Sequence, residues 1–208
     1  MSQPPLPAVF TQTPSALLPV AIDYPAALAL RQMAMQHDDY PKYLLAPEVS
    51  ALLHYVPDLH RRMLLATLWN TGARINEALA LTRGDFSLAP PYPFVQLATL
   101  KQRAEKARLW EITDRTVRTW IGEAVEAAAA DGVTFSVPVT PHTFRHSYAM
   151  HMLYAGIPLK VLQALMGHKS ISSTEVYTKV FALDVAARHR VQFQMPGADA
   201  VAMLKGEM

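Results

Sequence analysis

Helix start and stop signals recur along most of this sequence, and they constrain its fold more than any other feature. Proline stands at positions suited to the first helical turn, Pro47 and Pro141, where its missing N–H costs no hydrogen bond. Glycine follows apolar helical patterns at Gly72, Gly132 and Gly156, where it can adopt the left-handed conformation that ends a helix. The chain is therefore predicted to form several short helices with bounds set by their own sequence.

One segment interrupts this helical pattern. The stretch "PYPFVQLATL" (91–100) is flanked by proline and rich in β-formers, and "ARLWEI" (107–112) is a second short strand candidate. Together they predict a β-hairpin over residues 93–112. The expected fold class is mainly α with a small antiparallel β-sheet.

The length of 208 residues is enough to bury a full core and favours one folded domain. Residues 1–26 contain six prolines and little periodicity, and a short helix is predicted around Ala27–His37. We therefore divide the chain into a Pro-rich, partly disordered leader (1–40), a folded domain (41–192) and a C-terminal tail (193–208).

Charge is unevenly distributed along the chain. The net charge is only +2, whereas "KQRAEKAR" (101–108) alone carries four bases and one acid. Such a basic segment on a nearly neutral protein is typical either of a phosphate-contacting loop or of a solvated charged turn. The segment would form the tip of the predicted hairpin.

Composition also limits the chemistry and the compartment. The chain has no cysteine, which excludes disulfides, thiol catalysis and thiolate metal sites. Its apolar runs, such as "MLLATLW", are far shorter than a membrane span, and the N-terminus lacks a signal-peptide pattern. We expect a cytoplasmic protein with no membrane partner.

Polar residues gather at two places in the helical pattern. Arg145 follows His142 by three residues, so the two side chains share one face of a helix, and Arg74 precedes Glu77 by three at the start of another. An Arg74–Glu77 ion pair with a capping histidine would be purely structural. A metal site or a phosphate site would use the same residues for chemistry.

A metal site has little support in the sequence. His142 and His146 have the i, i+4 spacing that suits two imidazole ligands. However, Thr143 stands where a metalloprotease helix has glutamate, and Arg145 would place a cation beside the metal. No acidic residue nearby completes a ligand set, so we expect neither a metal nor another cofactor.

Phosphate chemistry accounts for more of these residues. Arginines bind non-bridging phosphate oxygens in bidentate fashion and stabilise a pentacoordinate transition state, and histidines can bind the same oxygens. A tyrosine hydroxyl beside such cations is a competent nucleophile, and Tyr177 follows His168 by nine residues. Residue types alone leave the choice between these interpretations open.

Three motifs together resemble the tyrosine recombinase (phage integrase) family. "NTGARINEALAL" (70–81) is similar to its first arginine box, T-G-x-R-x-x-E-x-x-x-L, and "TPHTFRHSYA" (140–149) to its H-x-x-R box. "LMGHKSISSTEVYTKV" (165–180) is similar to the L-G-H…T-x-x-Y box, with Met166 where leucine is usual. More narrowly, the chain is similar to plasmid resolvases, which reduce plasmid multimers to monomers.

The resemblance implies a fold, a site and a reaction. It makes residues 41–192 a tyrosine recombinase catalytic domain that cuts a double-stranded DNA recombination site through a 3′-phosphotyrosyl intermediate, without metal or ATP. It implies a tetramer on DNA, a location on the nucleoid or plasmid, and accessory proteins that the sequence does not identify. Its catalytic residues would be Arg74, Lys101, His142, Arg145, His168 and Tyr177.

One departure from the family affects the proposed general acid. The family's hairpin lysine falls on Lys101, with Lys106 as second choice, but the segment between Lys101 and His142 is short by a few dozen residues. Either "RLWEI" serves as the return strand of the hairpin or the hairpin is truncated. The alternative to an active recombinase is therefore a catalytically impaired DNA-binding relative.

Overall fold

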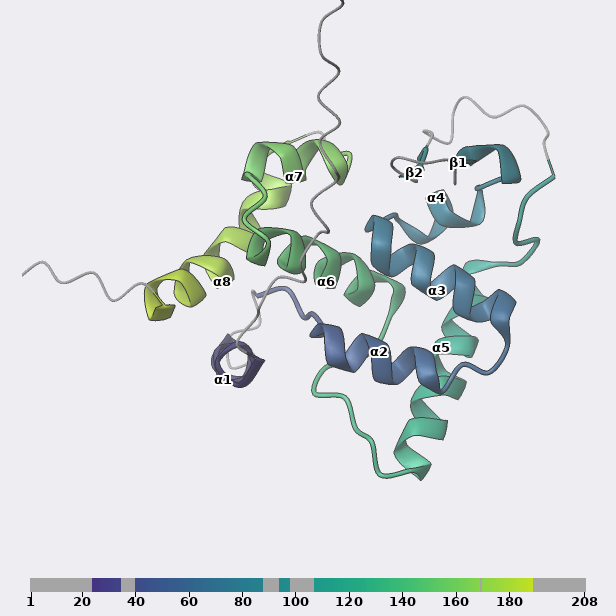
Figure 1. The fold of residues 1–208 in the computed structure, drawn as a ribbon, viewed down its shortest axis with the longest axis horizontal. Helices are drawn as coiled ribbons and strands as arrows, with labels where there is room; N and C mark the ends of the chain where they lie inside the picture. Colours follow the sequence, from purple (N-terminus) through teal and green to yellow (C-terminus); the bar gives the residue numbers. More distant parts are fainter. Residues whose placement is uncertain (1–23, 35–39, 88–93, 98–106, 169, 189–208) are drawn as a thin grey trace, which may run out of the picture.

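The structure is a computed structural model that describes residues 24–34, 40–87, 94–97, 107–168 and 170–188 (Figure 1). No described helix has both the length and the apolar character that a membrane crossing requires. The elements, in chain order, are α1 (Tyr24–Ala34), α2 (Ala46–His54), α3 (Leu59–Thr71), α4 (Ile75–Leu79), the 3-10 turn η1 (Arg83–Asp85), β1 (Phe86–Ser87), β2 (Phe94–Val95), α5 (Asp114–Ala130), α6 (Pro141–Tyr154), α7 (Leu159–Leu165) and α8 (Ser172–Arg188).

Helix α6 lies at the centre of the fold, between α3 on one side and α7 and α8 on the other (Figure 1). It contributes Phe144 to a core shared with α2 to α5, and Met150 and Leu153 to a second core shared with α1, α7 and α8. Burying each such side chain stabilises the fold by about 1.5–3 kcal/mol. Helix α6 thus joins the two cores, and its polar residues lie where they meet.

The predicted helix bounds are largely confirmed. Pro47 lies in the first turn of α2, and Gly72 ends α3 with a φ of 61°. The Thr140 hydroxyl accepts a hydrogen bond from the Thr143 amide at 3.1 Å and caps α6. Helix α5 ends just before Gly132, which has a φ of 80°. Local sequence chemistry therefore sets most helix ends in this chain.

The sheet differs from the predicted hairpin. Strand β2 pairs antiparallel with β1, which precedes it, and not with residues 107–112. Among the described residues this segment makes an isolated bridge, Thr82 to Arg108. Its Trp110 is fully buried in the core and donates from Nε1 to the His60 carbonyl at 3.2 Å. The small antiparallel sheet is confirmed with β1 as the partner of β2, while residues 98–106 of the predicted hairpin lie outside the described residues.

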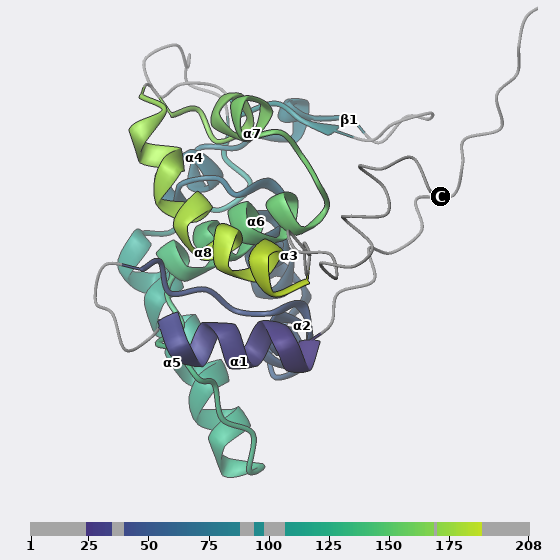
Figure 2. The same cartoon turned by 90° about the vertical axis from the view of Figure 1, so that its left-hand side faces the viewer.

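Helix α1 starts earlier than the helix predicted around residues 27–37, and residues 35–39 lie outside the described part. Its Arg31 is only 2% exposed and pairs with Glu48 of α2 and with Ser136, and it donates to the Tyr43 carbonyl at 3.1 Å. Helix α1 also packs against α8 (Figure 2). Part of the predicted leader is thus an ordered element of the fold, while the predicted tail 193–208 lies outside the described residues.

Candidate active site

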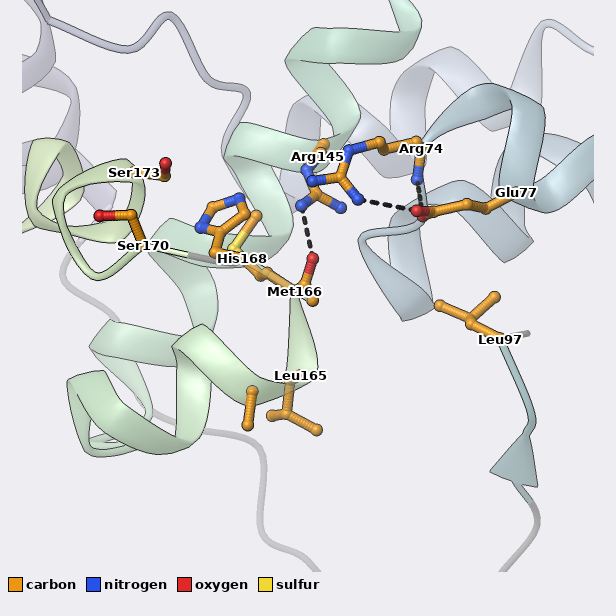
Figure 3. Close-up of a pocket in the computed structure, with 11 residues that line it drawn as sticks. Arg74, Glu77, Leu97, Arg145, Leu165, Met166, His168, Ser170 and Ser173 are labelled. Atoms are coloured by element: carbon orange, nitrogen blue, oxygen red, sulfur yellow. Dashed lines mark hydrogen bonds and ion pairs between the residues drawn. The ribbon is translucent and has the colours of Figure 1, made fainter. Parts of the chain in front are cut away.

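Arg145 is held by two backbone carbonyls from different parts of the chain. Its side chain is 4% exposed, and its guanidinium donates from Nη1 to the Gly72 carbonyl at 2.5 Å and from Nη2 to the Met166 carbonyl at 2.7 Å. These bonds tie α6 to the end of α3 and to the end of α7, and Figure 3 shows the second of them, to Met166. The fork geometry of the guanidinium allows two such bonds while other N–H groups stay free to bind an anion.

Gly72 has two reasons to be glycine. Its φ of 61° lies in the left-handed region, which a side chain disfavours. A Cβ at this position would lie 2.3 Å from Cδ1 of Tyr148 on α6, a separation that no real contact has. The close approach of α3 and α6 that brings the Gly72 carbonyl to Arg145 therefore depends on this glycine.

Arg74 reaches the same place from the start of α4. Its side chain is 49% exposed, and Nη1 lies 2.7 Å from Oε1 of Glu77. The second carboxylate oxygen of Glu77 accepts a hydrogen bond from the Arg74 amide at 2.8 Å, which caps the helix. The predicted Arg74–Glu77 pair is confirmed, and it orients a guanidinium that remains accessible to solvent.

His168 follows α7 directly. Gly167, with a φ of 59°, turns the chain, and Nδ1 of His168 lies 2.8 Å from the fully buried Thr174 hydroxyl of α8. Burial, helped by the cations Arg145 and Arg74, holds the pKa of His168 below its usual value. The ring is therefore neutral at pH 7, and its Nδ1 hydrogen bond fixes its orientation.

These three residues line one open cavity of about 520 Å³. Figure 3 shows Arg74, Arg145 and His168 approaching it from three separate elements, with Glu77 beside Arg74. The cavity has a net positive charge, because it contains two guanidinium groups and one carboxylate, and it also has hydroxyl groups. This charge suits the binding of a phosphate. Its polar lining comprises Arg74, Glu77, Arg145, His168, Ser170 and Ser173.

His142 lies beside this cavity but is not among its lining residues. It is exposed in the first turn of α6, and its ring meets that of His146 edge to face, with centroids 4.2 Å apart. Partial burial, followed by the nearby Arg145, Arg118 and Arg74, lowers the pKa of His142. The structure thus places His142 next to Arg145, as the spacing predicted, without bringing it into the cavity.

Tyr177 of α8 is buried. Its residue is 2% exposed, it does not line the cavity, and its hydroxyl lies 2.9 Å from Nδ1 of His146. Burial raises the pKa of Tyr177 to about 12, although the cations Arg145 and Arg74 act in the opposite direction. The hydroxyl is therefore a neutral phenol, close to the two arginines but enclosed by protein.

One residue near the cavity was not predicted from the sequence, and two predicted residues have no described position. The sequence indicated His146 only as a partner of His142 in a metal site, yet it contacts Tyr177. Its i, i+4 relation to His142 was the available signal. Lys101 and Lys106 lie outside the described residues, so their role stays a prediction.

Among described residues, no three His, Asp or Glu side chains come together as a metal site would require.

Comparison with known proteins identifies the family. The sequence profile of the Phage integrase family matches residues 104–183. A resolvase of Escherichia coli (strain K12) is 71% identical over 252 alignment positions, covering 96% of this chain and 94% of the relative. The chain belongs to the tyrosine recombinase (phage integrase) family. A probable site-specific recombinase in the afa region of Escherichia coli is 47% identical, covering 91% of this chain and 92% of the relative.

The alignment with the K12 resolvase also exposes a difference in length. It spans 252 positions, whereas 96% of the 208 residues is about 200, so about 50 positions have no residue in this recombinase. That the shortened segment lies between Lys101 and His142 stays a prediction from the motif spacing. The cavity residues Arg74, Arg145 and His168 all lie outside that segment.

Solved structures share the fold. The XerH site-specific recombinase in a post-cleavage complex with its palindromic difH substrate superposes with a TM-score of 0.57 at 18% identity, covering 71% of this chain and about half (52%) of that one. The XerA recombinase gives a TM-score of 0.53 at 19% identity, covering 74% and 65% of the two chains. The predicted fold class is confirmed.

Proposed function

We propose that this tyrosine recombinase is a resolvase that cuts and rejoins a double-stranded DNA site through a covalent phosphotyrosyl intermediate, and that it resolves plasmid multimers. The observation that carries the proposal is the convergence of Arg74, Arg145 and His168 on one cavity. Relatives named resolvase at 71% and 72% identity support the narrower assignment. No observation favours the alternative of an inactive DNA-binding relative.

In the proposed reaction the Tyr177 oxygen attacks the scissile phosphorus. A bond forms between the tyrosine oxygen and phosphorus, the bond from phosphorus to the 5′ oxygen breaks, and the phenol proton passes to solvent water. Lys101, or Lys106 in its place, would protonate the departing 5′ oxygen. Attack by the 5′-hydroxyl of another strand reverses these steps and frees Tyr177. The phosphodiester energy is conserved in the intermediate, so no ATP, metal or other cofactor is needed.

The cavity residues would stabilise the charge that develops on the phosphate. Arg145, fixed by two carbonyls, and Arg74, braced by Glu77, would each bind non-bridging oxygens, and neutral His168 would donate a further hydrogen bond. His142, at the margin of the cavity, would support the transition state once DNA is bound. Removing one preorganised donor of this kind lowers a rate by about 100- to 1,000-fold.

Assembly and domain roles extend the proposal. Residues 41–192 would form the catalytic domain, with 1–40 as leader and 193–208 as tail. Four copies would act together on paired DNA sites, on a plasmid or the nucleoid in the cytoplasm, with accessory proteins of unspecified identity. The XerH structures, which hold a difH substrate, support DNA-site binding by this fold.

A suicide-substrate assay tests the proposal. Duplexes that bind the full chain are selected from a random-sequence library, and the bound sequence is then prepared with a nick beside the scissile position so that cleavage is irreversible. We expect a denaturation-resistant protein–DNA band from wild type and none from Tyr177→Phe. Absence of the band from wild type on a duplex that it demonstrably binds would show that the chain binds DNA without cutting it.

A further inference from the structure

The contact between Tyr177 and His146 is the feature of the site that the proposed reaction does not use. Nδ1 of His146 lies 2.9 Å from the Tyr177 hydroxyl, and the two rings meet at 63° with centroids 5.5 Å apart. The residues lie on different helices, α6 and α8, which pack against each other. This hydrogen bond is therefore a tertiary contact between the helix that carries Arg145 and the helix that carries the proposed nucleophile.

The surroundings of Tyr177 prevent its hydroxyl from acting where it lies. The residue is 2% exposed and is absent from the lining of the cavity formed by Arg74, Arg145 and His168. A buried hydroxyl that is hydrogen-bonded to a histidine is not accessible to a DNA phosphate. Tyr177 must therefore become exposed before in-line attack, and any contact that stabilises its present position opposes that change.

We infer that His146 is a positioning residue that holds the Tyr177 hydroxyl out of the phosphate cavity, so that the His146–Tyr177 hydrogen bond must break before strand cleavage. The inference rests on the proposed role of Tyr177 as nucleophile. It adds a function for His146, which neither binds phosphate nor lines the cavity. The packing of α6 against α8 thus stabilises a state in which the Tyr177 hydroxyl is not available for attack.

The protonation states of the pair agree with a holding role and not with proton transfer. Burial, followed by the nearby His142 and Arg145, lowers the pKa of His146 to about 4, so its ring is neutral at pH 7. A neutral imidazole protonated on Nε2 accepts at Nδ1, and the phenol donates to it. With the pKa of Tyr177 raised to about 12, the proton stays on the phenol. His146 is thus a poor general base for Tyr177 in this position.

Substitutions at His146 separate the holding role from a structural one. His146→Phe keeps a ring against His142 but removes the acceptor, and His146→Leu removes it with a different shape, which guards against a folding defect specific to one variant. His146→Asn is the matched control, because its amide oxygen can occupy the place of Nδ1 and accept the same hydrogen bond. Thermal unfolding of each variant establishes that it is folded.

The first readout needs no DNA. Tetranitromethane nitrates accessible phenols, and peptide mass spectrometry gives the rate at Tyr177, with Tyr55 as internal reference because its hydroxyl bonds Asp131 far from His146. We expect nitration of Tyr177 to rise about 2- to 10-fold in H146F and H146L, the effect of losing one hydrogen bond, and to stay near wild type in H146N. A Tyr177 rate unchanged in both apolar variants would overturn the inference.

The second readout is the rate of covalent complex formation on the selected nicked duplex. Release of the hydroxyl predicts a faster rate in H146F than in wild type, by a factor similar to that of nitration, with unchanged DNA affinity. A slower rate together with faster nitration would show that cleavage uses the bond, and would also overturn the inference. If wild type forms no adduct, the proposed function fails, while the nitration rates still decide whether His146 holds Tyr177.

Discussion

The two arginines of the cavity are anchored in opposite ways. Arg145 is 4% exposed and donates to two backbone carbonyls, which come from the ends of α3 and α7. Arg74 is 49% exposed and is braced by Glu77, a side chain one helical turn away on its own helix. One arginine is part of the packing that joins three helices, and the other is a surface residue held by a local pair.

Because of this difference, substitution of each arginine should affect stability and cleavage to different degrees. Removing Arg145 leaves two carbonyls without their donor inside the protein, whereas removing Arg74 leaves a partly exposed carboxylate that still accepts from the backbone amide of residue 74. Both guanidinium groups line the same cavity, so both substitutions should impair phosphate binding in the transition state. Only the first should also weaken the fold.

Arg145→Met should have the largest effect. Methionine keeps most of the volume but donates no hydrogen bond, so we expect cleavage to fall by at least about 100- to 1,000-fold and the free energy of unfolding to fall by about 2 kcal/mol. Suicide-substrate cleavage and urea unfolding measure the two effects. Arg118→Met, which removes an exposed ion pair with Asp114, is the stability control and should change the free energy of unfolding by about 0.5 kcal/mol or less.

Arg74→Met should impair DNA cleavage without weakening the fold. Cleavage should fall by about 100-fold, with a change in unfolding free energy within about 0.5 kcal/mol. The pKa of His168, which burial and then Arg145 and Arg74 lower, should rise because one of these cations is gone. An NMR titration of the His168 ring measures that rise. A stability loss as large as that of R145M would contradict the contrast between the two arginines.

Gly72→Ala tests the support of Arg145 without touching either arginine. The added Cβ meets Tyr148 and the residue must hold a φ of 61°, so we expect the free energy of unfolding to fall by about 1–3 kcal/mol. Cleavage should fall less than in R145M, because the carbonyl shifts but the guanidinium remains. Gly132→Ala, also at positive φ but with open space around its Cβ, isolates the backbone part of the effect.

Thr174→Val should have the smallest effect. It removes the hydroxyl 2.8 Å from Nδ1 of His168 while it preserves the buried shape, so we expect a loss of about 1 kcal/mol in stability. Cleavage should fall only several-fold, since His168 keeps its place after α7 but loses the bond that orients its ring. Thr174→Ser, which retains the hydroxyl, should restore the cleavage rate.

Much of this site follows from short-range sequence signals. The caps at Thr140 and Pro141 and the stop at Gly72 set the helix ends that place Arg145 and Arg74, and the box motifs grouped both arginines with His168. The pairing of β2 with β1 did not follow, because the choice of strand partner is a tertiary effect that local propensity does not contain. The position of Tyr177 also did not follow, since a motif gives a residue's order in the chain but not the state of its side chain. His146 was missed for the same reason.

Mapping the residue that carries DNA tests the account most directly. The full chain is incubated with the selected nicked duplex, the adduct is digested with nuclease and protease, and mass spectrometry locates the residual nucleotide. The account predicts a 3′-phosphate ester on Tyr177, absent from Tyr177→Phe. An adduct on any other residue, or one that persists in that variant, would contradict it.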